Sequence, residues 1–185
     1  MNCNWYKLIL KLSRIKYGKK LRLKGVPVIV NKGRNFIIGN NVIIKSSFLS
    51  NLVGLYSRTV IVARTKTAKI FIGDNVGISG ATIYARNEIY IGHNTLIGGN
   101  TKILDNDFHP IEINARLNND IDAIDAKPIH IGDNCFIGCN SIILKGTKLG
   151  SGCVVGAGAV VSGEFADNSV IVGNPAKCIK ILGDN

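Results

Sequence analysis

One short segment combines the residue types that general acid–base catalysis requires. His109 follows two acidic residues, Asp105 and Asp107, and precedes Pro110. An imidazole titrates near neutral pH, and a neighbouring carboxylate can orient it as a general base, a role worth roughly 10²–10⁴-fold in rate. The segment therefore predicts a catalytic base at His109. A loop histidine that packs against Pro110 is the alternative.

The remaining histidines and the cysteines show no comparable pattern. His93 and His130 fall in an expected turn and an expected strand, and we assign neither a chemical task. Cys135 and Cys153 occupy positions that favour small buried residues, and Cys135 and Cys139 lack the partner ligands of a zinc site. Five cysteines, an odd number, favour a reducing compartment.

These residues are carried on a six-residue repeat that runs through most of the chain. An aliphatic residue recurs, commonly followed by glycine, with a small residue four positions later. The repeats begin at Ile38, Ile44, Ile72, Ile78, Ile91, Ile97, Ile131, Ile137, Ile143, Leu149 and Val155. A period of six fits neither an α-helix nor an alternating strand, and indicates a solenoid of short strands joined by tight turns. We expect an all-β fold with little helix.

The repeat breaks after Ile103, where Asp107 occupies the small-residue position. A carboxylate inside an aliphatic prism is costly, so the chain is expected to leave the solenoid there and to return near Ile129. Long loops in compact repeats are usually functional. The sequence therefore predicts an extruded active-site loop at about residues 105–128.

The N-terminal segment is basic and amphipathic. Residues 4–17 place five apolar residues on one helical face. They are Trp5, Leu8, Ile9, Leu12 and Ile15. The stripe predicts a helix that either caps the first rung or lies on a membrane surface, and we favour the cap because an open solenoid end would expose its core.

The distribution of charge bears on possible partners. The chain has a net charge of +11, and all residues before Asp74 are neutral or basic. This basic lobe could meet anionic membrane headgroups, in a weak surface association, or an acidic glycan, or the phosphates of a cofactor. A solvated basic face without a partner is the alternative. Nucleic acid is not an expected partner, because no nucleic-acid module is recognisable and aromatic residues are few.

We expect three segments: a basic helix or cap at 1–25, a β-helix at 26–172 that carries the loop 105–128, and a tail at 173–185. No stretch has the length of a transmembrane helix or the features of a signal peptide. The expected location is cytoplasmic.

Several stretches match a known family in its order. They are residues 103–110, 127–138, 155–161 and 173–177. In these stretches the chain resembles the hexapeptide-repeat acyltransferases, above all their sugar and polysaccharide O-acetyltransferase branch. The resemblance implies a left-handed parallel β-helix and a homotrimer with active sites between subunits. It also implies acetyl-coenzyme A as the acetyl donor, a sugar or glycan acceptor, and no required metal.

The resemblance also assigns roles to single residues. His109 would take the proton from the acceptor hydroxyl with Asp107 beside it, and the backbone N–H of Cys139 would stabilise the oxyanion. The contacts to coenzyme A would come from Phe136, Cys139, Ala157, Lys177 and Lys180. Phe136 replaces a tryptophan common in the family, and it keeps an aromatic wall. The acceptor would contact Ser79, Arg86, Asn87 and Asp105.

We therefore predict an acetyl-coenzyme A-dependent O-acetyltransferase that acts on a sugar hydroxyl of a surface polysaccharide or its precursor. Three alternatives stay open: a xenobiotic acetyltransferase of the streptogramin or chloramphenicol type, a γ-carbonic anhydrase-like metalloenzyme, and a non-catalytic β-helix protein. The metalloenzyme needs two histidines a few residues apart, a spacing that His93, His109 and His130 do not have.

Overall fold

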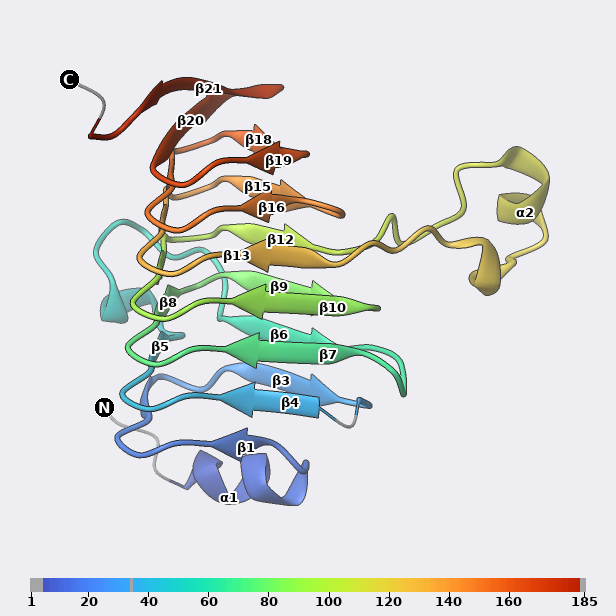
Figure 1. Ribbon diagram of the computed structural model, residues 1–185. Coiled ribbons are helices and arrows are strands. Elements are labelled where there is room, and N and C mark those ends of the chain that lie inside the picture. Colours follow the sequence, from blue (N-terminus) through green and yellow to red (C-terminus); the bar gives the residue numbers. More distant parts are fainter. Residues whose placement is uncertain (1–4, 34, 184–185) are drawn as a thin grey trace.

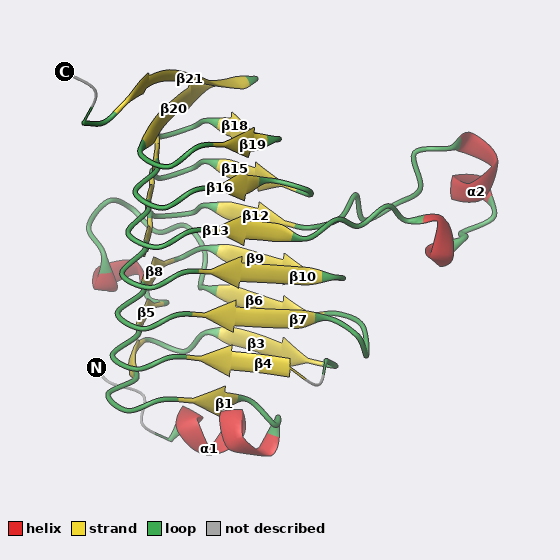
Figure 2. Cartoon of the chain, viewed as in Figure 1, coloured by secondary structure: helices red, strands yellow, loops and turns green. Residues whose placement is uncertain are grey.

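The computed structural model describes residues 5–33 and 35–183, which form a left-handed parallel β-helix with three flat sheets (Figures 1 and 2). The chain climbs from α1 at one end to β20 and β21 at the other, and one long loop projects away from the coil (Figure 1). The expected fold class, with its short N-terminal helix and extruded loop, is confirmed.

Each turn of the coil adds one strand to each sheet. The first sheet contains β1 (Lys16–Tyr17), β4 (Asn35–Ile38), β7 (Lys69–Ile72), β10 (Glu88–Ile91), β13 (Ile129–Ile131), β16 (Lys148–Leu149) and β19 (Glu164–Phe165). The second contains β2 (Arg22–Lys24), β5 (Ile43–Lys45), β8 (Gly77–Ser79), β11 (Leu96–Ile97), β14 (Phe136–Ile137), β17 (Val154–Val155), β20 (Ser169–Gly173) and β21 (Ala176–Ile181). The third contains β3 (Val28–Asn31), β6 (Val60–Ala63), β9 (Thr82–Ala85), β12 (Lys102–Leu104), β15 (Ile142–Leu144) and β18 (Val160–Val161).

Short helices lie at the end of the coil and in two excursions from it. Helix α1 (Tyr6–Leu12) lies beside β1 at the base (Figure 1). The 3₁₀ turn η1 (Phe48–Ser50) belongs to a short excursion, residues 46–58, while α2 (Ile113–Leu117) and η2 (Ile121–Ala123) belong to the long loop. Within the described residues, no helix is long and apolar enough to cross a bilayer.

The core is a column of aliphatic side chains with small residues at the corners. Its fully buried members include Ile38, Ile44, Ile70, Ile72, Ile78, Ile83 and Ile89. Cys135 and Cys153 are buried at corners, as the repeat predicted, and their thiols point to the carbonyl oxygens of Gly150 and Ala166. Burial raises the pKa of the Cys135 thiol to about 11, as expected of a space-filling group.

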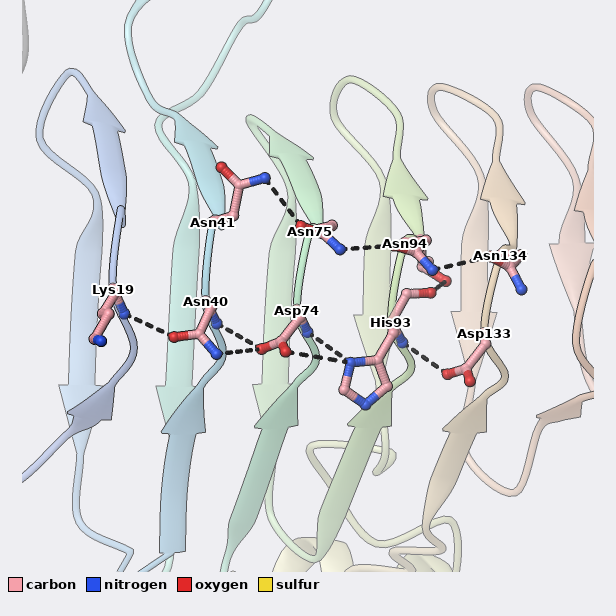
Figure 3. Close-up of polar contacts among 10 residues, drawn as sticks. Lys19, Asn40, Asn41, Asp74, Asn75, His93, Asn94, Asp133 and Asn134 are labelled. Carbon is pink, nitrogen blue, oxygen red and sulfur yellow. Dashed lines mark hydrogen bonds and ion pairs between the residues drawn. The ribbon is translucent and has the colours of Figure 1, made fainter.

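One corner of the prism is held by two ladders of polar contacts between successive rungs (Figure 3). In the first, the amide of Asn75 donates to Asn94 and that of Asn94 to Asn134, at 2.8 and 3.1 Å. In the second, the backbone N–H of Asp74 donates to Nδ1 of His93, and the backbone N–H of His93 donates to the carboxylate of Asp133. His93 is therefore part of the framework.

The N-terminal helix does not use the face that the sequence predicted. Tyr6 and Leu10 are buried against the first rung, whereas Trp5, Leu8 and Leu12 are mostly exposed. The helix ends at Leu12, and the chain then turns through Arg14, at a φ of 57°, to bury Ile15. The predicted stripe was too long for so short a helix, and its apolar residues at 5, 8 and 12 remain on the surface.

The structure adds detail at both ends of the expected three-segment division. Within residues 1–25, β1 and β2 pair with β4 and β5, so the coil already includes strands of this segment. Within residues 173–185, β21 pairs antiparallel with β20 and closes the second sheet. Residues 1–4 and 184–185 of the predicted cap and tail lie outside the described residues.

The asparagine ladder leads to a prediction about stability. Asn94 has a φ of 56°, a left-handed conformation that costs alanine about 1 kcal/mol, and its amide bonds to both neighbouring rungs. We expect Asn94→Ala to lower the free energy of unfolding by about 1–2 kcal/mol in urea denaturation. Asn94→Gly, which tolerates this φ but lacks the amide, should lose less. Equal stability of the alanine variant and the wild type would contradict this account.

Candidate active site

The two ends of the long loop are fastened together where they leave the coil. The backbone N–H of Asp107 donates to the carbonyl oxygen of Asp125 at 3.2 Å, and that of Lys127 to Asp105 at 2.9 Å. Lys145, in the turn between β15 and β16, then joins both ends through its ammonium group. Its Nζ lies 2.6 Å from the Asp125 carboxylate and also contacts that of Asp107.

Lys145 was missed by the sequence analysis, although the repeat contains a signal for it. Leu144 pairs with Leu104 in adjacent strands, so Lys145 stands one rung from the point where the loop begins. The Lys145 ammonium lowers the pKa of Asp125 below its ordinary value, mainly through the hydrogen bond between them. The loop base is thus a local ion-paired clamp, made of Lys145, Asp107 and Asp125.

Asp105 is fully buried, and its carboxylate binds the backbone of the corner on the preceding rung. Its carboxylate accepts the backbone N–H groups of Arg86 and Asn87, each at 2.7 Å, and the amide of Asn106 at 3.0 Å. Burial is the largest influence on this carboxyl and raises its pKa despite these donors. Asp105 therefore anchors backbone, and the corner that it holds includes two of the predicted acceptor residues.

His109 lies just beyond the clamp and is exposed. Its backbone N–H donates to the carbonyl oxygen of Asp107 at 2.7 Å, and Phe108 before it has a φ of 64° and packs on Tyr84. Across residues 5–33 and 35–183, no side-chain group hydrogen-bonds the imidazole. Within one chain, neither Asp105 nor Asp107 is paired with His109, because each carboxylate has other partners.

Arg86 and Asn87 contact this loop, and Arg86 lines a hollow beside it. The Arg86 guanidinium donates to the carbonyl oxygen of Ile121, and the Asn87 amide to that of Ala126 at 3.4 Å. The hollow has a volume of about 440 Å³. Its lining includes Arg64, Thr65, Tyr84, Arg86, Phe108 and Asp122. Two of the four predicted acceptor residues, Arg86 and Asn87, thus contact the loop that carries His109.

The other predicted site residues lie on the second sheet. Phe136 is half exposed on β14 and lines a cavity of about 280 Å³ with Ser79, Leu96 and Gly98. In the register of the strands, Phe136 is followed outward along the sheet by Val154, Val170 and Lys180. Lys177 stands opposite Val172 on the same antiparallel pair. An apolar file therefore leads from Phe136 to two exposed lysines.

Beside this file, stacked glycines leave backbone groups uncovered. A Cβ on Gly138 would come within 2.5 Å of the Ala157 nitrogen, and one on Gly98 within 2.7 Å of the Cys139 nitrogen. Only glycine permits this close stacking of corners. In the described part of the chain, the N–H groups of Cys139 and Ala157 have no protein acceptor, so both can donate to an oxygen of a ligand.

The two groups of residues occupy different corners of the prism. Asp107, Arg86 and His109 belong to the corner between the third and first sheets. Ser79, Phe136, Cys139 and Ala157 belong to the second sheet and its corner with the third. A single chain therefore does not bring His109 to Cys139, and a site that uses both needs two copies of the chain.

The described residues contain no group of three or more His, Cys, Asp or Glu that could hold a metal ion. The histidines lie apart: His93 is in the corner ladder, His109 is on the loop, and His130 stacks on Tyr90 at 4.5 Å between ring centroids. The aromatic file on the first sheet continues to Phe71, which stacks on Tyr90 at 4.7 Å.

Comparison with known proteins finds similar sequences. Residues 128–162 match the family model described as the hexapeptide repeat of succinyl-transferase. The chain is also 34% identical, over 117 residues, to a putative lipopolysaccharide biosynthesis O-acetyl transferase of Escherichia coli K12, and the match covers 60% of each protein. Over these stretches the chain carries the hexapeptide repeat and is similar to acetyltransferases.

Solved structures of acyltransferases share the fold. An N-acyltransferase from Bacillus cereus, solved in complex with dTDP and 3-hydroxybutyryl-CoA, has a TM-score of 0.68 at 23% identity, covering 98% of this chain and 90% of that one. A maltose O-acetyltransferase from Clostridium difficile 630 has a TM-score of 0.51 at 26% identity, covering 96% and 75%. The chain spans about half the length of the curated relatives that it matches.

The clamp can be tested without an assay of activity. We expect Lys145→Met to lower hydrogen-exchange protection at the amides of Asp107 and Lys127 by roughly tenfold, because both loop ends lose their shared cation. Lys148→Met is the matched control, since Lys148 forms an exposed ion pair with Glu164. Protection that falls equally in both variants, or in neither, would contradict a specific role for Lys145.

Proposed function

We propose that the protein is an acyltransferase that moves an acetyl group from acetyl-coenzyme A to a sugar hydroxyl of a surface polysaccharide or its precursor. The observation that carries the proposal is the division of the site residues between two corners of one prism. In a homotrimer with cyclic symmetry, one corner of each chain faces a different corner of its neighbour. Three identical sites would then form between subunits, each with a histidine from one chain and backbone donors from the next.

The second sheet supports coenzyme A as the donor. From Phe136 to Lys180 the outward file runs over three strand spacings, roughly 14 Å, with apolar contacts first and cations last. The pantetheine arm would lie along Phe136 and Val154 and accept a hydrogen bond from the N–H of Ala157, with the N–H of Cys139 at the thioester. Lys177 and Lys180 would attract the nucleotide phosphates as point charges.

The reaction follows from these positions. His109 would take the proton from the acceptor hydroxyl as that oxygen attacks the thioester carbon. The negative charge on the carbonyl oxygen would be held by the N–H of Cys139. Collapse of the intermediate breaks the carbon–sulfur bond, and the proton on His109 passes to the leaving thiolate. Asp107 would act at a distance, by holding the loop through Lys145.

A sugar acceptor is inferred from the names of the relatives and from the hollow beside the loop. The E. coli relative is named as a lipopolysaccharide O-acetyl transferase, and a structural neighbour is a maltose O-acetyltransferase. The hollow lined by Arg86, Asp122 and Phe108, the residue before His109, offers hydrogen-bonding groups that a sugar can use. A cytoplasmic location is supported by the free thiols of Cys135, Cys139, Cys153 and Cys178.

The test is release of free thiol from acetyl-coenzyme A across sugars, nucleotide sugars, oligosaccharides and xenobiotic alcohols. With the best acceptor, His109→Ala should lose at least about a hundredfold in turnover and keep its affinity for coenzyme A in calorimetry. Phe136→Ala, the complementary control, should lose affinity for coenzyme A.

Two outcomes would contradict the proposal. One is thiol release that no acceptor raises above the rate of hydrolysis. The other is near-wild-type turnover by His109→Ala. Preference for a xenobiotic alcohol over every sugar would agree with the proposed acetyl transfer but overturn the proposed substrate class.

A further inference from the structure

The base of the coil presents an apolar stripe that the fold does not cover. Trp5, Leu8 and Leu12 are 62%, 64% and 76% exposed, and Ile9 beside them is partly exposed. The spacing of 5, 8, 9 and 12 sets these residues along one side of α1. The opposite side, with Tyr6 and Leu10, packs on the first rung and fixes the helix in place. The packing of Tyr6 and Leu10 on the coil thus keeps the apolar stripe on the outer side of the helix.

A basic hollow adjoins the stripe. Leu12 lines it at the end of α1, together with Arg14, Lys32 and Lys66, and its volume is about 340 Å³. Among the described residues, none of these three cations forms an ion pair with a carboxylate, and no acidic residue precedes Asp74 in the sequence. The same surface therefore offers aliphatic and indole groups next to a site that attracts an anion.

This combination selects among possible occupants. Two copies that met through the stripe would bring their basic residues together, which like-charge repulsion disfavours. Nucleic acid would use the cations and leave the aliphatic side chains in water. A bilayer with anionic headgroups satisfies both, because the apolar residues enter the headgroup boundary while Lys and Arg stay at the phosphates. Tryptophan favours this boundary, where its ring is apolar and its N–H is solvated.

We propose that this end of the protein, through Trp5, Leu8, Leu12 and the cations around the hollow, docks on an anionic membrane surface. The docking is peripheral and reversible, since the stripe is one short helix. The helix lies across the base of the coil, so the coil would rise from the bilayer with the long loop well above it (Figure 1). This inference is independent of the acyl-transfer reaction, because none of these residues belongs to the proposed active site.

The experiment uses the intact protein and its single tryptophan. Trp5 is the only tryptophan of the chain, so its fluorescence reports on the stripe alone. With vesicles of phosphatidylcholine and phosphatidylglycerol at 7:3, we expect a blue shift of emission and co-sedimentation, both weakened at high salt. Vesicles of phosphatidylcholine alone should bind little.

Variants separate the apolar and ionic contributions. Leu8→Ser/Leu12→Ser should weaken binding by about tenfold or more through lost apolar burial. Lys32→Gln/Lys66→Gln should weaken it by roughly tenfold or more and reduce the salt dependence. The matched control is Leu49→Ser/Leu52→Ser, which changes two leucines that are 79% and 87% exposed on the 46–58 excursion, and it should bind as the wild type does.

Melting temperatures and thiol release with a soluble acceptor should be unchanged in Leu8→Ser/Leu12→Ser. The proposal is overturned if the intact protein stays in the supernatant with anionic vesicles. It is also overturned if the control loses as much binding as the stripe variant. A stripe variant that changes oligomeric state in analytical ultracentrifugation while its vesicle binding is unaffected would assign the stripe to self-association instead.

Discussion

The structure depends on one constraint: the backbone groups of each rung are satisfied by the rungs above and below it. Strand β10, for example, pairs with β7 on one side and β13 on the other, although the long loop separates β10 from β13 in the sequence. Buried N–H and C=O groups cannot be left without partners at acceptable cost, so the coil must continue without a gap. Any departure from the coil has to begin and end at neighbouring points of one corner and satisfy its own backbone.

That constraint explains where the chemistry is placed. The loop that carries His109 leaves at Asp105, returns at Lys127, and closes through backbone bonds and the Lys145 clamp. The glycine corners at Cys139 and Ala157 belong to the unbroken part of the coil, where close stacking exposes their N–H groups. Because the prism keeps its corners apart, the base and the oxyanion donor of the proposed site are separated within one chain. Oligomerisation would then be part of the catalytic design.

The fold could be predicted from the sequence because a period of six has few physical solutions. Glycine after most of the repeated aliphatic residues indicated the turns, and the acid at position 107 marked the exit of the loop. The environments that the sequence did not indicate were those set by contacts between rungs. Asp105, rather than Asp107, is the buried carboxylate, and its three donors come from the preceding corner and from Asn106. The helical stripe of α1 was ambiguous because a seven-residue helix can pack through either side.

The central claim is that each site is shared between two copies of the chain, and subunit complementation tests it most directly. His109→Ala and Phe136→Glu/Lys180→Glu should each be inactive alone, since each removes one half of every site. When the two are co-expressed in equal amounts, a site is intact only where the correct halves meet, so random assembly predicts about a quarter of wild-type turnover. Mixed assemblies that stay as inactive as their parents, although shown by mass spectrometry to contain both chains, would contradict the account.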